Sequence, residues 1–180
     1  MAPQTPQRSG RPGGAWAPLD ERRARLVAAD LLSRRAWTRA ELTRRLRRRG
    51  APADVAADVV DDLVARGHVD DAAFARQWVA TRSVRGYGAG RLRAELSARG
   101  VDAPVIDTAL AELDFADALG RARALAARRL SALRGGDPRR MAARLRDHLL
   151  RRGYPAGLVV RVVREALGAR VADLPPTLIE

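Results

Sequence analysis

The sequence lacks several kinds of chemistry. Among its 180 residues there is no cysteine and no lysine, and there are only two histidines and seven aromatic residues. The absence of cysteine excludes disulfides and thiolate metal sites, and two histidines alone cannot hold a metal ion, so we expect no cofactor. No apolar run approaches the length of a membrane span, and residues 1–18 lack the apolar core of a signal peptide. The sequence therefore predicts a soluble, cytoplasmic protein that does not contact a membrane.

Arginine is the most informative residue type that is present. All 34 basic residues are arginine, and against 21 acidic residues they give a net charge of +13. The excess is uneven, because residues 1–69 carry 14 arginines and 8 acidic residues, residues 70–113 carry 6 of each, and residues 114–180 carry 14 and 7. A protein this basic is expected to bind polyanions or acidic surfaces. The charge balance places that binding at the two ends of the chain.

A pattern centred on a glycine occurs three times. Before Gly50, Gly100 and Gly153 stand two leucines one helical turn apart, and apolar residues at helical spacing follow each glycine. The leucine pairs are Leu42 and Leu46, Leu92 and Leu96, and Leu145 and Leu149. Leucines at i and i+4 share one helix face, and a glycine just beyond them can adopt the left-handed conformation that ends a helix. The pattern predicts three helical hairpins with a period of about fifty residues.

Each hairpin follows another amphipathic stretch, so the repeating unit is expected to contain three helices. The sequence predicts an all-α, elongated, tandem array of three three-helix repeats in which each repeat covers its neighbour's apolar face. Thr38 with Glu41 forms a capping-box pattern at the start of the first hairpin. The expected boundaries are residues 20–69, 70–113 and 114–168 for the repeats, with a disordered N-terminal tail at 1–19 and a C-terminal tail at 169–180.

Few residues suggest catalysis. Asp70 and Asp71 are the most enzyme-like pair, but adjacent carboxylates at a helix start are better interpreted as satisfying free N–H groups. The glycine-rich segment 86–90 follows a predicted helix and has no P-loop lysine, so we interpret it as an interhelical linker. Trp78 and Phe74 fit the apolar face of their helix better than a base-stacking platform. We expect no catalytic residues, and hence a protein that is not an enzyme.

Two arginine clusters are the candidate binding residues. Arg44, Arg47 and Arg48 fall on the side of their helix opposite its leucines, and Arg140, Arg144 and Arg151 share one face of the equivalent helix in the third repeat. A basic helix face can simply be solvated, but two such faces in equivalent positions favour a shared function. We therefore expect these six arginines to bind a protein partner or nucleic acid.

A longer motif resembles a known family. It comprises Gly67 to Ala75 (GHVDDAAFA), then Arg82 and Gly86, then Arg91 to Leu96 (RLRAEL) with Gly100-Val101. These residues resemble the RecX family of recombinase regulators. The likeness covers about residues 21 to 168 and is strongest in the first two repeats. In the third repeat Tyr154 follows the glycine and the Asp-Asp-x-x-Phe segment is missing.

The resemblance implies a non-enzymatic protein that binds the RecA recombinase filament in its helical groove, and we expect the protein to be a monomer. It implies mainly inhibition of the filament's ATPase, strand-exchange and coprotease activities in DNA repair. The arginine faces could also contact single- or double-stranded DNA. The alternative function is a DNA-binding transcription factor, because two helices joined through a glycine turn also describe a helix-turn-helix.

Overall fold

The computed structural model describes residues 18–132 and 137–168. The expected C-terminal tail, and the N-terminal tail up to residue 17, lie outside these residues. Within the described ranges the chain forms nine α-helices and no strand, which confirms the all-α prediction. The helices are α1 Glu21–Arg34, α2 Arg39–Arg48, α3 Ala53–Ala65, α4 Asp71–Val84, α5 Ala89–Ala98, α6 Ala103–Ala111, α7 Phe115–Ala132, α8 Pro138–Arg151 and α9 Ala156–Leu167.

Local chemistry explains where these helices begin and end. Asp70 is the N-cap of α4, as the sequence predicts, and its carboxylate accepts hydrogen bonds from the N–H groups of Ala72 (2.8 Å) and Ala73 (2.9 Å). Such a cap satisfies donors that have no partner inside the helix. The three hairpin glycines all have positive φ, +96° at Gly50, +80° at Gly100 and +85° at Gly153. Each of the predicted hairpin turns is therefore present.

Each repeat has a hydrophobic core of its own, so the prediction that each repeat covers its neighbour's apolar face is wrong. The six leucines of the glycine-centred pattern are all completely buried, two in each core. The first core also holds Val59 and Val60, the second Ile106, and the third Val162 and Val163. Because the cores are separate, the free energy of unfolding should approximate the sum of the stabilities of the three repeats and of the two interfaces between them.

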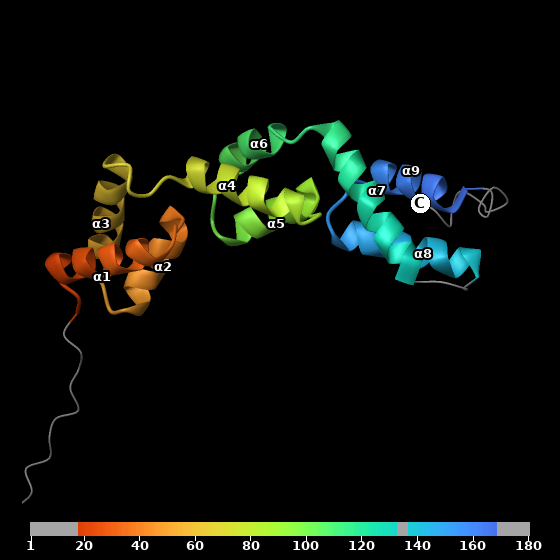
Figure 1. Ribbon diagram of the computed structural model, residues 1–180. Helices are drawn as coiled ribbons and strands as arrows, with labels where there is room; N and C mark the ends of the chain where they lie inside the picture. The colour runs from red at the N-terminus through yellow and green to blue at the C-terminus, as the bar shows by residue number, and fades with distance from the viewer. Residues whose placement is uncertain (1–17, 133–136, 169–180) are drawn as a thin grey trace, which may run out of the picture.

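The three repeats follow one another along a line and confirm the elongated tandem array (Figure 1). Helices α1 to α3 lie at one end, α4 to α6 in the middle and α7 to α9 at the other end (Figure 1). In this view α2, α5 and α8 lie toward the lower edge of the array, whereas α3, α6 and α9 lie toward the upper edge. Equivalent helices therefore form two rows, and charge on one row can act over the length of the molecule.

Candidate partner-binding surface

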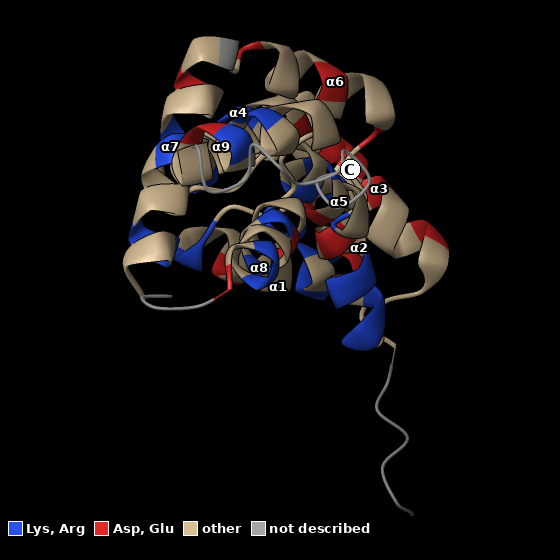
Figure 2. Ribbon diagram, turned by 90° about the vertical axis from the view of Figure 1, so that its right-hand side faces the viewer, with Lys and Arg blue, Asp and Glu red and all other residues tan. Residues whose placement is uncertain are grey.

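Charge is divided between the two rows of helices. Helix α2 carries five arginines and one glutamate, and α8 carries five arginines and one aspartate. Helix α3 carries four aspartates and no arginine, and the only charged residue of α6 is Asp107. In Figure 2 the blue segments of α2 and α8 lie on a different side of the array from the red segments of α3 and α6. The row of α2, α5 and α8 is thus basic at its two ends, and the row of α3, α6 and α9 is acidic over the first two repeats only, since α9 carries two arginines and one glutamate.

The structure exposes the predicted arginines of the first repeat. Arg44, Arg47 and Arg48 are all exposed, whereas Leu42 and Leu46 on the same helix are completely buried. Arg47 and Arg48 have no side-chain partner among the described residues. Arg44 donates from its Nη2 to the carbonyl of Arg99 (3.4 Å), so its guanidinium lies at the edge of the second repeat. The guanidinium groups of Arg47 and Arg48 are therefore available to bind another molecule.

The equivalent cluster in the third repeat is also exposed. Arg140, Arg144 and Arg151 point to solvent from α8, and none of them forms an ion pair with a described residue. The structure does not bring this cluster together with Arg44, Arg47 and Arg48, because a whole repeat separates α8 from α2 (Figure 1). A single small ligand cannot reach both clusters, whereas an extended partner can.

The middle repeat presents much less free charge on the same row. Arg91 of α5 forms an ion pair with Glu95 (2.9 Å), and Arg93 pairs with Asp107 of α6. These pairs neutralise the arginines of α5 within the repeat itself. The structure therefore has two basic faces on either side of a largely neutral centre.

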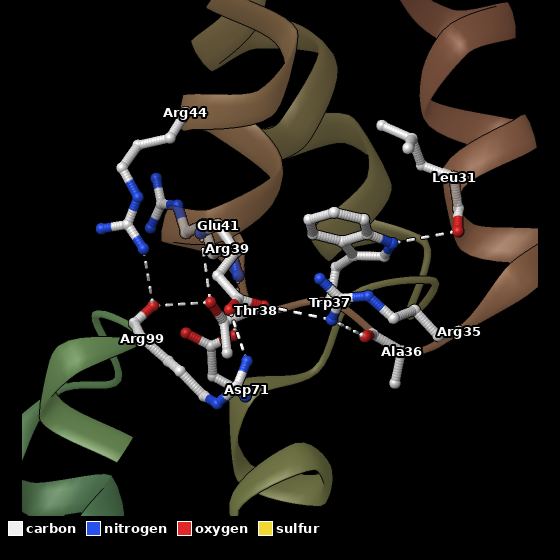
Figure 3. A network of polar contacts seen from close by, with 10 residues as sticks. All are labelled: Leu31, Arg35, Ala36, Trp37, Thr38, Arg39, Glu41, Arg44, Asp71 and Arg99. Atoms are coloured by element: carbon white, nitrogen blue, oxygen red, sulfur yellow. Dashed lines mark hydrogen bonds and ion pairs between the residues drawn. The ribbon is translucent and has the colours of Figure 1, made fainter. Parts of the chain in front are cut away.

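Side chains hold the first and second repeats together at a polar seam (Figure 3). Thr38, the N-cap of α2, accepts from the N–H of Glu41 (3.1 Å) and donates from Oγ1 to the carbonyl of Arg99 in the second repeat (2.8 Å). The glutamate does not complete the predicted capping box. Its Oε1 instead accepts from Nη1 of Arg99 (2.5 Å), an ion pair in which both side chains are largely buried.

Asp71 belongs to the same seam, which corrects the expectation that its role is local. Its Oδ1 accepts from the N–H of Arg39, the first residue of α2, at 2.8 Å (Figure 3). The second repeat thus caps a helix of the first. Burial raises the pKa of Asp71, and the Arg39 hydrogen bond opposes that rise.

The aromatic pair of α4 completes this seam from inside the second repeat. Phe74 stacks on Trp78 with ring centroids 5.7 Å apart, and the indole Nε1 donates to Glu95 (3.1 Å). Guanidinium groups of Arg99 (4.1 Å) and Arg82 (4.4 Å) lie over the Trp78 ring. These cation–π contacts occupy the indole, which supports the prediction that it is not an open base-stacking platform.

Backbone atoms form the seam between the second and third repeats, which the sequence interpretation missed. Gly88 donates its N–H to the carbonyl of Arg152 (2.7 Å), and Gly90 donates to the carbonyl of Gly153 (3.0 Å). A Cβ on Gly88 would lie 2.5 Å from the carbonyl oxygen of Gly153, closer than real side chains approach. The glycine-rich segment is therefore a docking surface as well as a linker. The alternating glycines Gly86, Gly88 and Gly90 are the sequence feature that could have indicated this docking surface, because glycine permits close approach of another backbone.

The described residues contain no constellation that suggests chemistry. No group of three or more His, Cys, Asp or Glu residues within them could hold a metal ion. Burial lowers the pKa of His148, and the nearby charges of Arg152, Arg129 and Arg151 lower it further. None of the helices in this part of the chain is long and apolar enough to cross a membrane.

Comparison with known proteins gives the same three-part division of the chain. Models of the first, second and third three-helix domains of RecX match residues 24–63, 70–110 and 116–163. The chain is 46% identical over 169 residues to the regulatory protein RecX of Thermobifida fusca, a match that covers 93% of this chain and 91% of that protein. It is 42% identical over 160 residues to RecX of Mycobacterium ulcerans, covering 88% and 92% of the two chains.

Solved structures share the fold. A crystal structure of RecX from Lactobacillus salivarius superposes with a TM-score of 0.75 at 19% identity and covers 81% of this chain and 96% of that one. A second crystal structure of a regulatory protein RecX gives a TM-score of 0.73 at 22% identity, with 79% and 70% coverage. From the three domain matches and the identity to curated relatives over most of its length, the chain belongs to the RecX family of regulatory proteins.

Proposed function

We propose that this protein binds the RecA recombinase filament and mainly inhibits its ATPase, strand-exchange and coprotease activities in DNA repair. It acts in the cytoplasm as a monomer and without catalysis of its own. Family membership supports the regulatory role, since the relatives are named regulatory proteins. The finer assignment rests on one observation, the pair of exposed basic faces at opposite ends of an elongated array.

The geometry favours a long partner. Arg44, Arg47 and Arg48 on α2 and Arg140, Arg144 and Arg151 on α8 make two separate contacts of the same sign. When two weak sites are joined by a stiff scaffold, the second binds at high effective concentration, so both contribute to avidity. A filament groove formed by protein and nucleic acid offers repeated acidic and phosphate groups over such a distance.

Co-sedimentation separates this function from DNA binding alone. The protein is spun with RecA assembled on single-stranded DNA and, in parallel, with naked single- and double-stranded DNA at the same salt concentration. We expect preferential recovery with the filament and a dose-dependent fall in its ATPase rate. Equal recovery with naked duplex, without ATPase inhibition, would favour the helix-turn-helix transcription factor instead.

Charge-removal variants test the two faces. Changing Arg44, Arg47 and Arg48 to alanine, or Arg140, Arg144 and Arg151 to alanine, should weaken filament binding and ATPase inhibition while helicity is unchanged. The salt dependence should flatten by about one unit per lost phosphate contact. A matched control replaces three other exposed arginines, Arg22, Arg76 and Arg164, and so removes the same charge from elsewhere. If the control loses as much binding as either variant, net charge rather than these two faces determines binding.

A further inference from the structure

A small basic recess lies at the seam between the second and third repeats. It has a volume of about 140 Å³ and is formed where the end of α4 meets the side of α7. Its lining residues are Val84, Arg85, Gly86, Arg121, Ala124, Leu125 and Arg128. Neither α2 nor α8 contributes a residue to it, so the recess is separate from both arginine faces.

The charged residues that line this recess are all basic. Arg85, Arg121 and Arg128 are the three charged residues of its lining, and no acidic residue lines it. Arg85 and Arg128 have no carboxylate partner in the part of the chain that the structure describes. Arg121 has one ion pair, a long one of 3.7 Å to the exposed carboxylate of Asp117. Like charges that line one recess repel one another unless an anion lies between them.

Hydrogen-bond donors at this seam also lack acceptors. The Nε of Arg121 is buried and has no hydrogen-bond partner, although buried donors are usually satisfied. The hydroxyl of Tyr154 is likewise buried without a partner; burial raises its pKa, and the charges of Arg121 and Arg152 oppose that rise. Arg152 lies next to the recess, since its Nη1 donates to the carbonyl of Arg85 (3.1 Å). Of the residues that line the recess itself, Arg121 therefore has a buried donor without an acceptor.

We propose that this recess binds a phosphate group. Three guanidinium groups offer more donors than the two oxygens of a carboxylate can accept, whereas a tetrahedral phosphate presents several acceptor oxygens to planar guanidinium forks. Arg85 belongs to the second repeat, and Arg121 and Arg128 belong to the third. A bound phosphate therefore bridges the two repeats and stabilises their relative orientation. This inference does not depend on binding to RecA.

Phosphate titration of the full chain measures the site directly. Thermal unfolding is followed as sodium phosphate replaces sodium chloride at constant ionic strength, and the dissociation constant follows from the concentration dependence of the melting temperature. We expect phosphate to stabilise the protein more than chloride does. Arg85→Gln and Arg128→Gln should each weaken phosphate binding about tenfold, as expected for the loss of a charge-assisted hydrogen bond.

Matched variants separate this site from net charge and from misfolding. Arg76→Gln removes an exposed arginine of α4 that does not line the recess, and it should leave the phosphate response unchanged. Arg128→Lys keeps the charge but loses the fork, and it should bind with intermediate affinity. Arg85 and Arg128 are both exposed, so their substitution is not expected to unfold the protein. A wild-type response in the Arg85→Gln, Arg128→Gln double variant would overturn the proposal, as would an equal loss in Arg76→Gln.

A second arm identifies the source of the phosphate. The protein is melted with inorganic phosphate, with a short single-stranded oligonucleotide, or with the same oligonucleotide carrying an uncharged methylphosphonate backbone, and competition between phosphate and each oligonucleotide is measured. If only the charged oligonucleotide raises the melting temperature, and the rise requires Arg85 and Arg128, the ligand is a nucleic-acid phosphodiester. If only inorganic phosphate does so, the ligand is a small phosphate compound. Both results support the anion site, and the absence of any arginine-dependent effect in both arms contradicts it.

Discussion

The two seams between repeats occupy the same position but use different chemistry. In each, the carbonyl of the arginine just before a hairpin glycine accepts a hydrogen bond from the N-cap residue of the preceding repeat's second helix. At the first seam the donor is the hydroxyl of Thr38, which reaches Arg99 at 2.8 Å. At the second it is the backbone N–H of Gly88, which reaches Arg152 at 2.7 Å. The hydrogen bond is common to both seams although the donor group differs.

This difference sets how closely the repeats approach. A side chain on Thr38 fills space between the first two repeats, whereas Gly88 and Gly90 let the third repeat contact the α5 backbone itself. Among the described residues, which begin at residue 18, no repeat precedes the hairpin of the first repeat. There the N–H of Leu19 donates to the carbonyl of Gly50 (3.0 Å), the bond that Gly90 makes to Gly153 at the second seam. The segment before α1 thus makes the same backbone contact to the first hairpin that the second repeat makes to the third.

The largest predicted effect breaks the closer seam. A Cβ on Gly153 would lie 2.1 Å from the backbone nitrogen of Arg91, and its φ is already left-handed. We expect Gly153→Ala to cost roughly 3 kcal/mol or more, the sum of backbone strain and overpacking. Gly50→Ala is the control, because φ there is also positive but nothing lies within 4 Å of the added Cβ. It should cost only about 1–2 kcal/mol.

Gly100 completes this series with an intermediate environment. Its added Cβ would meet the Cβ of Ala40 at 2.5 Å, a side-chain atom rather than backbone. Thermal melts of the three alanine variants should therefore rank Gly153 as the most damaging and Gly50 as the least. Equal losses at all three glycines would mean that left-handed strain alone matters and that the seams contribute little.

A second prediction compares the two arginines that precede the hairpin glycines. Arg99 pairs with the largely buried Glu41 and lies over Trp78, so Arg99→Ala leaves this carboxylate with only its longer ion pair to Arg35 (3.4 Å) and should cost about 2 kcal/mol. Arg152 lies 4.9 Å from the Tyr87 ring centroid and bonds a carbonyl, and Arg152→Ala should cost about 1 kcal/mol.

A double-mutant cycle tests the pair itself. Glu41→Ala combined with Arg99→Ala should show a coupling free energy of at least about 0.5 kcal/mol in urea unfolding. Strict additivity would show that the ion pair does not stabilise the first seam.

The sequence predicts the repeats well because their determinants are local. The spacing of Leu42 and Leu46 around Gly50, and its recurrence twice more, specifies a hairpin without reference to distant residues. The same holds for Asp70, whose carboxylate bonds N–H groups two and three residues away. The three-helix repeats and their tandem order follow from such short-range patterns, and both are confirmed.

The seams could not be predicted in the same way, because their partners are far apart in the chain. Glu41 matches a capping box by spacing, yet its carboxylate bonds Arg99, 58 residues away. Asp71 matches a local helix start, yet it accepts from Arg39. The exposure of the arginine faces follows from helical periodicity. Whether Arg47 lacks an acidic neighbour depends on packing that no local pattern contains.

A third prediction uses Asp71 to sharpen the role of the first seam. Asp71→Ala removes the acceptor for the Arg39 N–H and should cost about 1 kcal/mol, as loss of a helix cap does. Asp71→Asn keeps an acceptor oxygen and should be close to neutral. Burial raises the pKa of Asp71, so its ionisation opposes folding and its contribution to stability falls as pH rises through and above its unfolded value of 3.8. Asp71→Asn should remove that pH dependence, and melts between pH 3.5 and 6 can measure it.

The last prediction concerns the third repeat, whose stability should change with pH in the opposite direction. Burial and three arginines lower the pKa of His148, so the unfolded chain binds its proton more readily than the folded chain. The stability of the third repeat should therefore be fully present above pH 6.5 and should fall as pH drops through that value. Hydrogen exchange resolves the effect by repeat, because the cores are separate and can open separately. We expect amides of α8 to lose protection between pH 7 and 5.5 while those of α2 do not, and His148→Gln should abolish the difference. An unchanged pH dependence in that variant would place the titrating group elsewhere in the repeat.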